Sequence, residues 1–172
     1  MHPTEGLCMV SFNRNRADLL DDLISKFPDD PIQEGPADAA EILRLTRDHQ
    51  ATYKKPFYLK GTPFQCRVWS EICKVPSGKQ ITYGHLAVMA DQPRSVRAVA
   101  RACGANNLAL VVPCHRVVGL ETMGSYRWGN PIKAFLIGME YSHDRSSGSP
   151  FSGELIPADE WDRKVAEMEA GT

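Results

Sequence analysis

The residues best suited to covalent chemistry stand together in Pro113-Cys114-His115-Arg116. A cysteine becomes a nucleophile when nearby positive charge and a base favour its thiolate. His115 and Arg116 place both residue types next to the thiol. Neighbours on an extended strand point to opposite faces, so His115 would reach the sulfur only across a turn or through a bridging water. Cys-His pairs in buried runs are also common as purely structural features, so the run alone leaves both interpretations open.

A histidine that acts as a base needs a carboxylate to orient its imidazole. Glu140 is one candidate, because it stands at the predicted end of a helix that Asn130-Pro131 begins. The negative end of a helix disfavours a carboxylate, which argues for a role at that position. The alternative is that Glu140 is only a solvated helix end.

The segments around the cysteine must position it. Residues 108–112 form a short, continuous apolar run, which predicts a buried strand that delivers Cys114 at its end. A glycine-punctuated loop over residues 119–129 separates this strand from the helix that carries Glu140.

Helices are predicted upstream of the strand. The capping box Thr62-Pro63-Phe64-Gln65 begins one helix. Thr82 can cap a second helix over residues 83–90, and a third runs over residues 93–103 before Gly104. The last two helices, joined by a tight turn, predict a helix-turn-helix.

The third helix has two unlike faces. Arg94, Arg97 and Arg101 fall within about 60° of one another at helical spacing. The opposite side holds Val96, Val99, Ala100 and Cys103. The arginine face fits an anionic partner, and it equally fits an ordinary solvated basic face.

Charge is distributed unevenly along the chain. The net charge is −1, but residues 60–133 carry ten Lys/Arg and only three acidic residues, Glu71, Asp91 and Glu121. A basic middle segment between acidic flanks indicates either a surface that binds nucleic acid or a cationic face that is only solvated.

Composition limits the remaining choices. A chain of 172 residues with 42% hydrophobic residues can bury a core but hardly two large domains. Five cysteines without a CxxC pair argue against a disulfide framework or a cysteine-rich zinc module. No apolar run approaches the roughly 18 residues of a membrane span, and residues 1–30 do not resemble a signal peptide. We therefore expect a soluble intracellular protein of the nucleus or cytoplasm.

Three parts are predicted along the chain. Residues 1–59 form a small α/β piece, with a strand over residues 6–12 and helices over residues 17–27 and 37–50. Residues 60–141 contain the elements described above. Residues 142–172 begin with a Ser/Gly/Pro-rich linker and end in a tail in which Trp161, Val165 and Met168 could align on a helix.

Several motifs together resemble the O6-alkylguanine-DNA alkyltransferases. They are GTPFQxxVW, PxGxxxTYGxLA, PxxxRAV, the asparagine eight residues before the cysteine, PCHRVV and GxYRWG, and they span Gly61 to Glu140. The RAVA and YRWG variants resemble those of the bacterial Ada-type carboxy-terminal domain.

The resemblance implies roles for the central residues. Cys114 would accept the alkyl group, His115 would activate it through a water, and Glu140 would orient His115. Asn106 would act as a hinge that hydrogen-bonds across the turn before the cysteine. The reaction would be a single-turnover methyltransfer without a cofactor or a metal.

The resemblance also implies residues that handle DNA. Arg97 would enter the base stack, whereas we expect Arg94 and Arg101 to contact phosphate. Tyr83 would rotate the phosphate and donate a proton to guanine. The extruded base would meet backbone groups of Val117, Ser125 and Tyr126.

The implied fold is α/β (α+β), with a reduced amino-terminal α/β domain followed by a mostly helical, winged helix-turn-helix-like domain. The implied partner is duplex DNA containing O6-alkylguanine, bound through its minor groove by a monomer.

The chain departs from the family in several places. The amino-terminal strand hairpin is reduced to residues 6–12, and the loop at 119–123 is one residue shorter than in some relatives. Ser125 and Ile132 replace the commoner Gly and Arg.

Two other functions use the same residues. A lesion-binding protein would recognise alkylguanine without transfer, but such relatives replace the cysteine that Cys114 provides. A winged-helix regulator could sense oxidation through Cys114, although it would have no need of His115, Glu140 and Tyr83.

Overall fold

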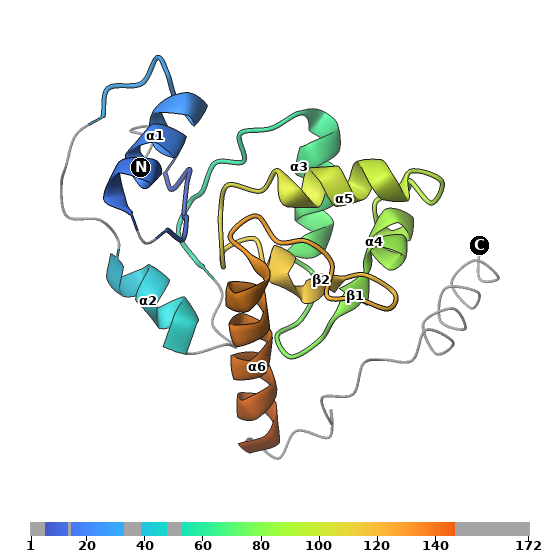
Figure 1. The fold of residues 1–172 in the computed structure, drawn as a ribbon. Coiled ribbons are helices and arrows are strands. Elements are labelled where there is room, and N and C mark those ends of the chain that lie inside the picture. The colour runs from blue at the N-terminus through green and yellow to red at the C-terminus, as the bar shows by residue number, and fades with distance from the viewer. Residues whose placement is uncertain (1–5, 14, 33–38, 48–52, 147–172) are drawn as a thin grey trace.

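The computed structural model describes residues 6–13, 15–32, 39–47 and 53–146 (Figure 1). Helices α1 (Arg16–Lys26) and α2 (Ala39–Arg47) come first, close to the predicted ranges. The predicted strand over residues 6–12 is not continuous. It forms two isolated parallel bridges, Leu7 with Phe57 and Val10 with Leu108, which attach it to two distant parts of the chain.

Three helices pack against one another in the core. In α3 (Pro63–Ile72), the capping box is present as predicted: the Thr62 hydroxyl accepts from Gln65 N and the Gln65 side chain accepts from Thr62 N. The buried Trp69 indole donates to the Ala102 carbonyl at 2.8 Å, which ties α3 to α5 (Val96–Gly104). Because this indole N–H is hydrogen-bonded, the largest core side chain is buried without leaving its polar group unpaired.

Helix α4 (Tyr83–Met89) begins at the predicted cap, where the Thr82 side chain accepts from His85 N. A short connection joins it to α5, and Figure 1 shows these two helices on the side of the molecule away from α1 and α2. Helix α5 starts at Val96 rather than at residue 93. Arg94 therefore lies in the connection, and Val96, predicted on the apolar side, is 38% exposed.

The prediction of a buried strand over residues 108–112 is wrong. Apart from the single bridge at Leu108, the segment is a series of turns, and Leu110 has φ 68°. The polar side chain of Asn106 accepts from Leu108 N and donates to Val112 O, so it holds the segment bent. Side-chain capture of backbone groups competes with strand formation in this way.

A small parallel sheet adjoins the turn. Strand β1 (Ile81–Thr82) pairs with β2 (Val117–Val118), with Ile81 opposite Val117. A short 3-10 helix, η1 (Cys114–Arg116), leads directly into β2. The fold is thus a mixture of helices with a small sheet.

The last described element is the long helix α6 (Asn130–Ser146). It begins where predicted but continues beyond residue 140, into the segment predicted as linker. The predicted tail helix near Trp161 lies outside the described residues. Within the described part of the chain, no helix has the length and apolar character needed to cross a membrane.

Candidate active site

Cys114 opens η1 at the end of the bent segment, and only 4% of the residue is exposed. The Asn106 amide donates to its sulfur at 3.1 Å and to the Val112 carbonyl at 2.9 Å. One buried side chain therefore fixes both the turn and the sulfur. The predicted role of Asn106 as a hinge across this turn is consistent with these contacts.

The surroundings of the Cys114 sulfur favour its thiolate. A hydrogen bond from the neighbouring Cys103 thiol lowers the pKa of Cys114 most, and the Asn106 amide and the Lys133 ammonium lower it further, against burial, which raises it. The same hydrogen bond, together with burial, raises the pKa of Cys103. Of the two adjacent thiols, Cys114 is therefore the one that ionises first.

His115 and Glu140 form a buried pair. His115 Nε2 lies 2.8 Å from Glu140 Oε1, and burial lowers the pKa of the imidazole. Because an ionised carboxylate can only accept, Nε2 carries the proton of the neutral ring, and Nδ1 is left as an acceptor. Nδ1 is buried and has no partner among the described residues. This nitrogen is therefore available to take a proton.

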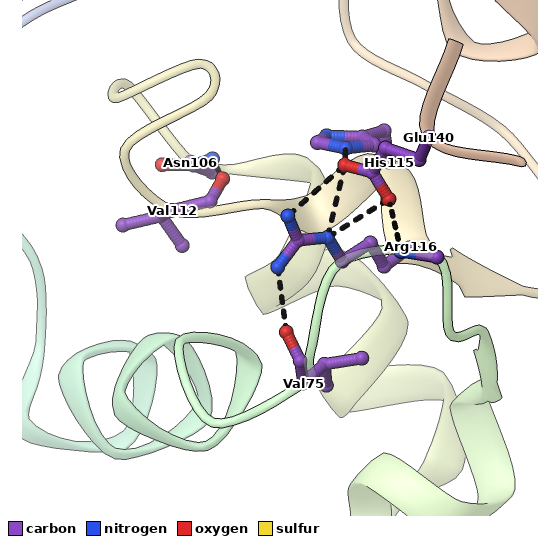
Figure 2. A network of polar contacts seen from close by, with 7 residues as sticks. Val75, Asn106, Val112, His115, Arg116 and Glu140 are labelled. Atoms are coloured by element: carbon purple, nitrogen blue, oxygen red, sulfur yellow. Dashed lines mark hydrogen bonds and ion pairs between the residues drawn. The ribbon is translucent and has the colours of Figure 1, made fainter. Parts of the chain in front are cut away.

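The Glu140 carboxylate is held from several directions, as Figure 2 shows. Arg116 donates to it through Nε at 3.1 and 3.2 Å and through Nη2 at 3.0 Å, and Gly78 N donates at 3.0 Å. Arg116 also donates through Nη1 to the Val75 carbonyl at 2.6 Å. The carboxylate thus joins α6 to η1 and to the turn that follows α3.

Ionisation of Glu140 follows from these contacts. Burial raises its pKa, but the hydrogen bond from His115 and the charge of Arg116 outweigh burial, and the pKa falls to about 2. Glu140 lies inside α6 rather than at its end, so the argument from the helix dipole was wrong. Arg116, which the sequence presented only as a positive charge beside the thiol, in fact holds this carboxylate.

Comparison with known proteins points to the same family as the sequence motifs. Residues 63–142 match the family described as 6-O-methylguanine DNA methyltransferase, DNA binding domain. The Escherichia coli protein "Bifunctional transcriptional activator/DNA repair enzyme Ada" is 35% identical over 146 residues, which are 81% of this chain and 41% of that protein. Residues 63–142 belong to this alkyltransferase family, and the chain is similar to Ada.

Other relatives extend the comparison. The "Methylated-DNA--protein-cysteine methyltransferase" of Saccharomyces cerevisiae is 44% identical over 93 residues, which are 53% of this chain and 50% of that protein. The chain spans about half the length, or less, of these two curated relatives.

Solved structures of family members share the fold. The O6-methylguanine-DNA methyltransferase of Pyrococcus kodakaraensis superposes with a TM-score of 0.67 at 29% identity, covering 77% of this chain and 84% of that one. The Mycobacterium tuberculosis OGT, solved in complex with DNA, has a TM-score of 0.58 at 32% identity, covering 60% of this chain and 65% of that one.

The predicted base-contacting residues lie on neighbouring segments. The Tyr83 hydroxyl donates to the Ser125 carbonyl at 3.2 Å, and burial raises the pKa of Tyr83 to about 12, so the phenol keeps its proton at neutral pH. Val117 is buried in β2. Tyr126 is also buried, and its hydroxyl has no partner among the described residues.

The three predicted DNA-contacting arginines are exposed. Arg97 and Arg101 lie on α5, and Arg94 lies in the connection before it. Helix α5 therefore joins the two parts of the site, because its buried face carries Cys103 toward Cys114 while its exposed face presents two arginines.

Sequence reasoning missed Lys133. This lysine is fully buried, and its ammonium donates to the carbonyls of Val117 at 2.7 Å and Met123 at 2.6 Å. A signal existed, because Lys133 stands three and seven residues before Leu136 and Glu140, which are both buried. That spacing places all three on one face of α6.

No group of three or more His, Cys, Asp or Glu that could hold a metal ion occurs among the described residues. The expectation of a site without metal or cofactor stays a prediction.

The pKa of Glu140 predicts how stability depends on pH. Since the pKa falls from 4.5 to about 2 on folding, ionised Glu140 stabilises the fold above about pH 4.5, and this contribution disappears as the pH falls toward 2. The contribution is on the order of 3 kcal/mol. Urea titrations give the difference in unfolding free energy between the parent and Glu140→Gln. This difference should decrease by about this amount as the pH falls toward 2.

The matched control is Glu121→Gln, which changes an exposed carboxyl in the loop after β2. Its difference from the parent should stay near zero throughout. A parent-minus-Glu140→Gln difference that does not change with pH would contradict the assignment of a low pKa to Glu140.

Proposed function

We propose that the protein repairs DNA by moving an alkyl group from O6 of guanine to the sulfur of Cys114, once per molecule. The observation that carries the proposal is the buried, readily ionised Cys114 next to a neutral histidine held by a carboxylate. The names of the Escherichia coli and yeast relatives, a DNA repair enzyme and a methylated-DNA–protein-cysteine methyltransferase, support the same reaction.

DNA binding is assigned to the exposed face of α5. Helices α4 and α5 would form the helix-turn-helix, and docking in the minor groove suits a protein that searches for damage, because that groove carries little sequence code. Arg94 and Arg101 would contact phosphates, and Arg97 would fill the gap in the base stack. The Mycobacterium tuberculosis relative, solved with DNA, supports binding to nucleic acid.

Extrusion of the damaged nucleotide is required because O6 of guanine lies inside the duplex, out of reach of the buried Cys114 sulfur. The base would enter beside the segment from β2 to Tyr126, where backbone groups of Val117, Ser125 and Tyr126 can contact it. Tyr83 already donates to this segment, so its hydroxyl is placed to transfer that hydrogen bond to the base.

The transfer step follows from the polar groups. His115 Nδ1 takes the Cys114 proton through a bridging water, and the thiolate attacks the alkyl carbon. The carbon–sulfur bond forms as the bond to O6 breaks, and the electron pair stays on guanine, which takes a proton from Tyr83. The proton that His115 took from Cys114 then returns through solvent to the Tyr83 oxygen. The product is a thioether, which has no good leaving group, so the cysteine is not regenerated.

We also propose that the protein acts as a monomer, in which residues 1–59 form an amino-terminal unit, residues 60–141 form the alkyltransferase unit, and residues 142–172, into which α6 continues, form a linker and tail. The amino-terminal unit would support residues 60–141 through the bridge between Val10 and Leu108 and through the ion pair between Asp22 and Arg127 at 2.7 Å.

Cys114 is expected to be the only alkyl acceptor. Incubation with a duplex containing O6-methylguanine should add one methyl group per molecule by intact mass, and peptide mapping should place it on Cys114. Cys114→Ser should add none, whereas Cys66→Ser, which changes a half-buried thiol, should match the parent. Methyl mass on another cysteine, or transfer by Cys114→Ser, would refute the assignment.

Arg97 and Arg101 should have separable roles. Arg101→Ala should weaken binding to damaged and undamaged duplex alike and reduce the salt dependence by about one phosphate contact. Arg97→Ala should slow transfer at saturating protein more than it weakens binding. Repair by Arg97→Ala at the parental rate would remove Arg97 from the base stack.

His115 should act by raising the thiolate fraction. His115→Ala should react slowly with methylated duplex at pH 7 and recover part of the rate at alkaline pH, where hydroxide ionises the thiol instead. Single-turnover rates across pH, together with unchanged duplex affinity, test this role. A variant equally slow at every pH would show that His115 is needed only for structure.

A further inference from the structure

Lys133 is a buried cation without an ion pair in the part of the chain that the structure describes. None of the residue is exposed, and its two hydrogen-bond partners are the carbonyls of Val117 and Met123. Carbonyls satisfy the N–H donors but do not neutralise the charge, and a buried charge is costly unless an opposite charge compensates it.

The ammonium bonds the carbonyl of Val117, three residues after Cys114 and directly beyond η1, so the Cys114 sulfur is the group in this part of the described fold that can supply the opposite charge. Burial lowers the pKa of Lys133, whereas the thiolates of Cys103 and Cys114 oppose that effect. Of these two thiols, Cys114 ionises first. The nearby carboxylate, Glu140, already accepts from Arg116 and His115.

The other titratable groups around Cys114 do not replace Lys133. The groups that interact electrostatically with the sulfur from packed elements are Cys73 at the end of α3, Tyr83 of α4, Cys103 of α5, Tyr126 and Lys133. Four of the five are neutral thiols or phenols at pH 7, because the pKa of each is raised. His115 is neutral and Arg116 is paired with Glu140, so Lys133 is the cation left to balance the sulfur.

Lys133 also holds the loop that borders the site. Val117 and Met123 stand on either side of the turn that Gly119 N closes on Thr122 O at 2.9 Å. After Met123, Gly124 has φ 68°, and a Cβ there would lie 2.8 Å from the Tyr83 ring. The ammonium therefore fastens both ends of the loop, next to the segment that contains Ser125, to α6.

We propose that Lys133 is a positioning residue with two linked tasks: it is the counter-cation of the Cys114 thiolate, and it closes the loop between Val117 and Met123. The inference rests on the proposed function in one respect, the state after transfer. A thioether carries no charge, so alkylation removes the anion and leaves the ammonium buried beside a neutral sulfur. The alkylated protein should therefore be less stable than the free thiol form, and the loop should loosen first.

The first test measures thiol ionisation without DNA. The rate at which iodoacetamide modifies Cys114 is followed from pH 6 to 10 by peptide mass in the parent, Lys133→Met, Lys133→Arg and Lys74→Met. Lys74 is an exposed lysine paired with Glu71 and serves as the control. In Lys133→Met the profile should move to higher pH by about one unit, which is roughly a tenfold lower rate at pH 7, with recovery near pH 10.

The other variants test whether the charge of residue 133 causes the change in the pH profile. Lys133→Arg keeps the charge and should stay close to the parental profile, as should Lys74→Met. If Lys133→Met does not fold, Lys133→Gln, which keeps N–H donors but no charge, takes its place. A profile in the uncharged variant that superposes on the parental one would overturn the proposal.

The second test measures how much stability the protein loses when methylation removes the anion beside Lys133. Thermal midpoints are compared before and after methylation by an O6-methylguanine duplex, in the parent and in Lys133→Met. The parent should lose more stability on methylation than the variant, which has no charge to strand. Equal losses would contradict the second part of the proposal. If the parent takes up no methyl group, the proposed function fails, and the comparison is made on the carboxamidomethyl form instead.

Discussion

The geometry of the site depends on the hydrogen bonds that the Glu140 carboxylate accepts. It receives hydrogen bonds from Arg116, from His115 and from the backbone of Gly78, so one buried anion joins the long last helix, the short helix that carries Cys114 and the turn after α3. A buried carboxylate in this position is tolerated because Arg116 neutralises its charge and the other donors satisfy its oxygens. The orientation of the histidine, and with it the free Nδ1, follows from the placement of this carboxylate.

Asn106 performs the corresponding task for the sulfur. Its amide bends the segment before Cys114 by capturing Leu108 and Val112, and the same amide donates to the sulfur. Because both polar networks are buried and largely satisfied, each fixes its members in one arrangement. The thiol and its base are thus positioned by two separate side chains that come from different parts of the sequence.

Much of the site was predictable from the sequence, and the failures have physical causes. Residue types pointed to Cys114, His115 and Glu140, and the family resemblance added Asn106. The structure brings these four residues together around η1. Local capping rules placed the starts of α3 and α4, since those contacts involve residues close in sequence. The bent segment was predicted as a strand because the apolar run does not itself show that the preceding Asn106 side chain captures its backbone. Lys133 was missed because burial of a charge depends on carbonyls from other segments.

The fully buried Lys133 and the partly buried Arg116 differ in the anion that balances each charge. Arg116 has a permanent anion in Glu140, whose low pKa keeps it ionised across the neutral range, so this part of the site is the same before and after any reaction at the sulfur. Lys133 has no such partner among the described residues, and the charge that suits it exists only while Cys114 is a thiolate. Such a site favours the thiolate of Cys114 over an uncharged form of the same sulfur. In the proposed reaction, the electrostatic arrangement that promotes attack by the sulfur would therefore disfavour the thioether product.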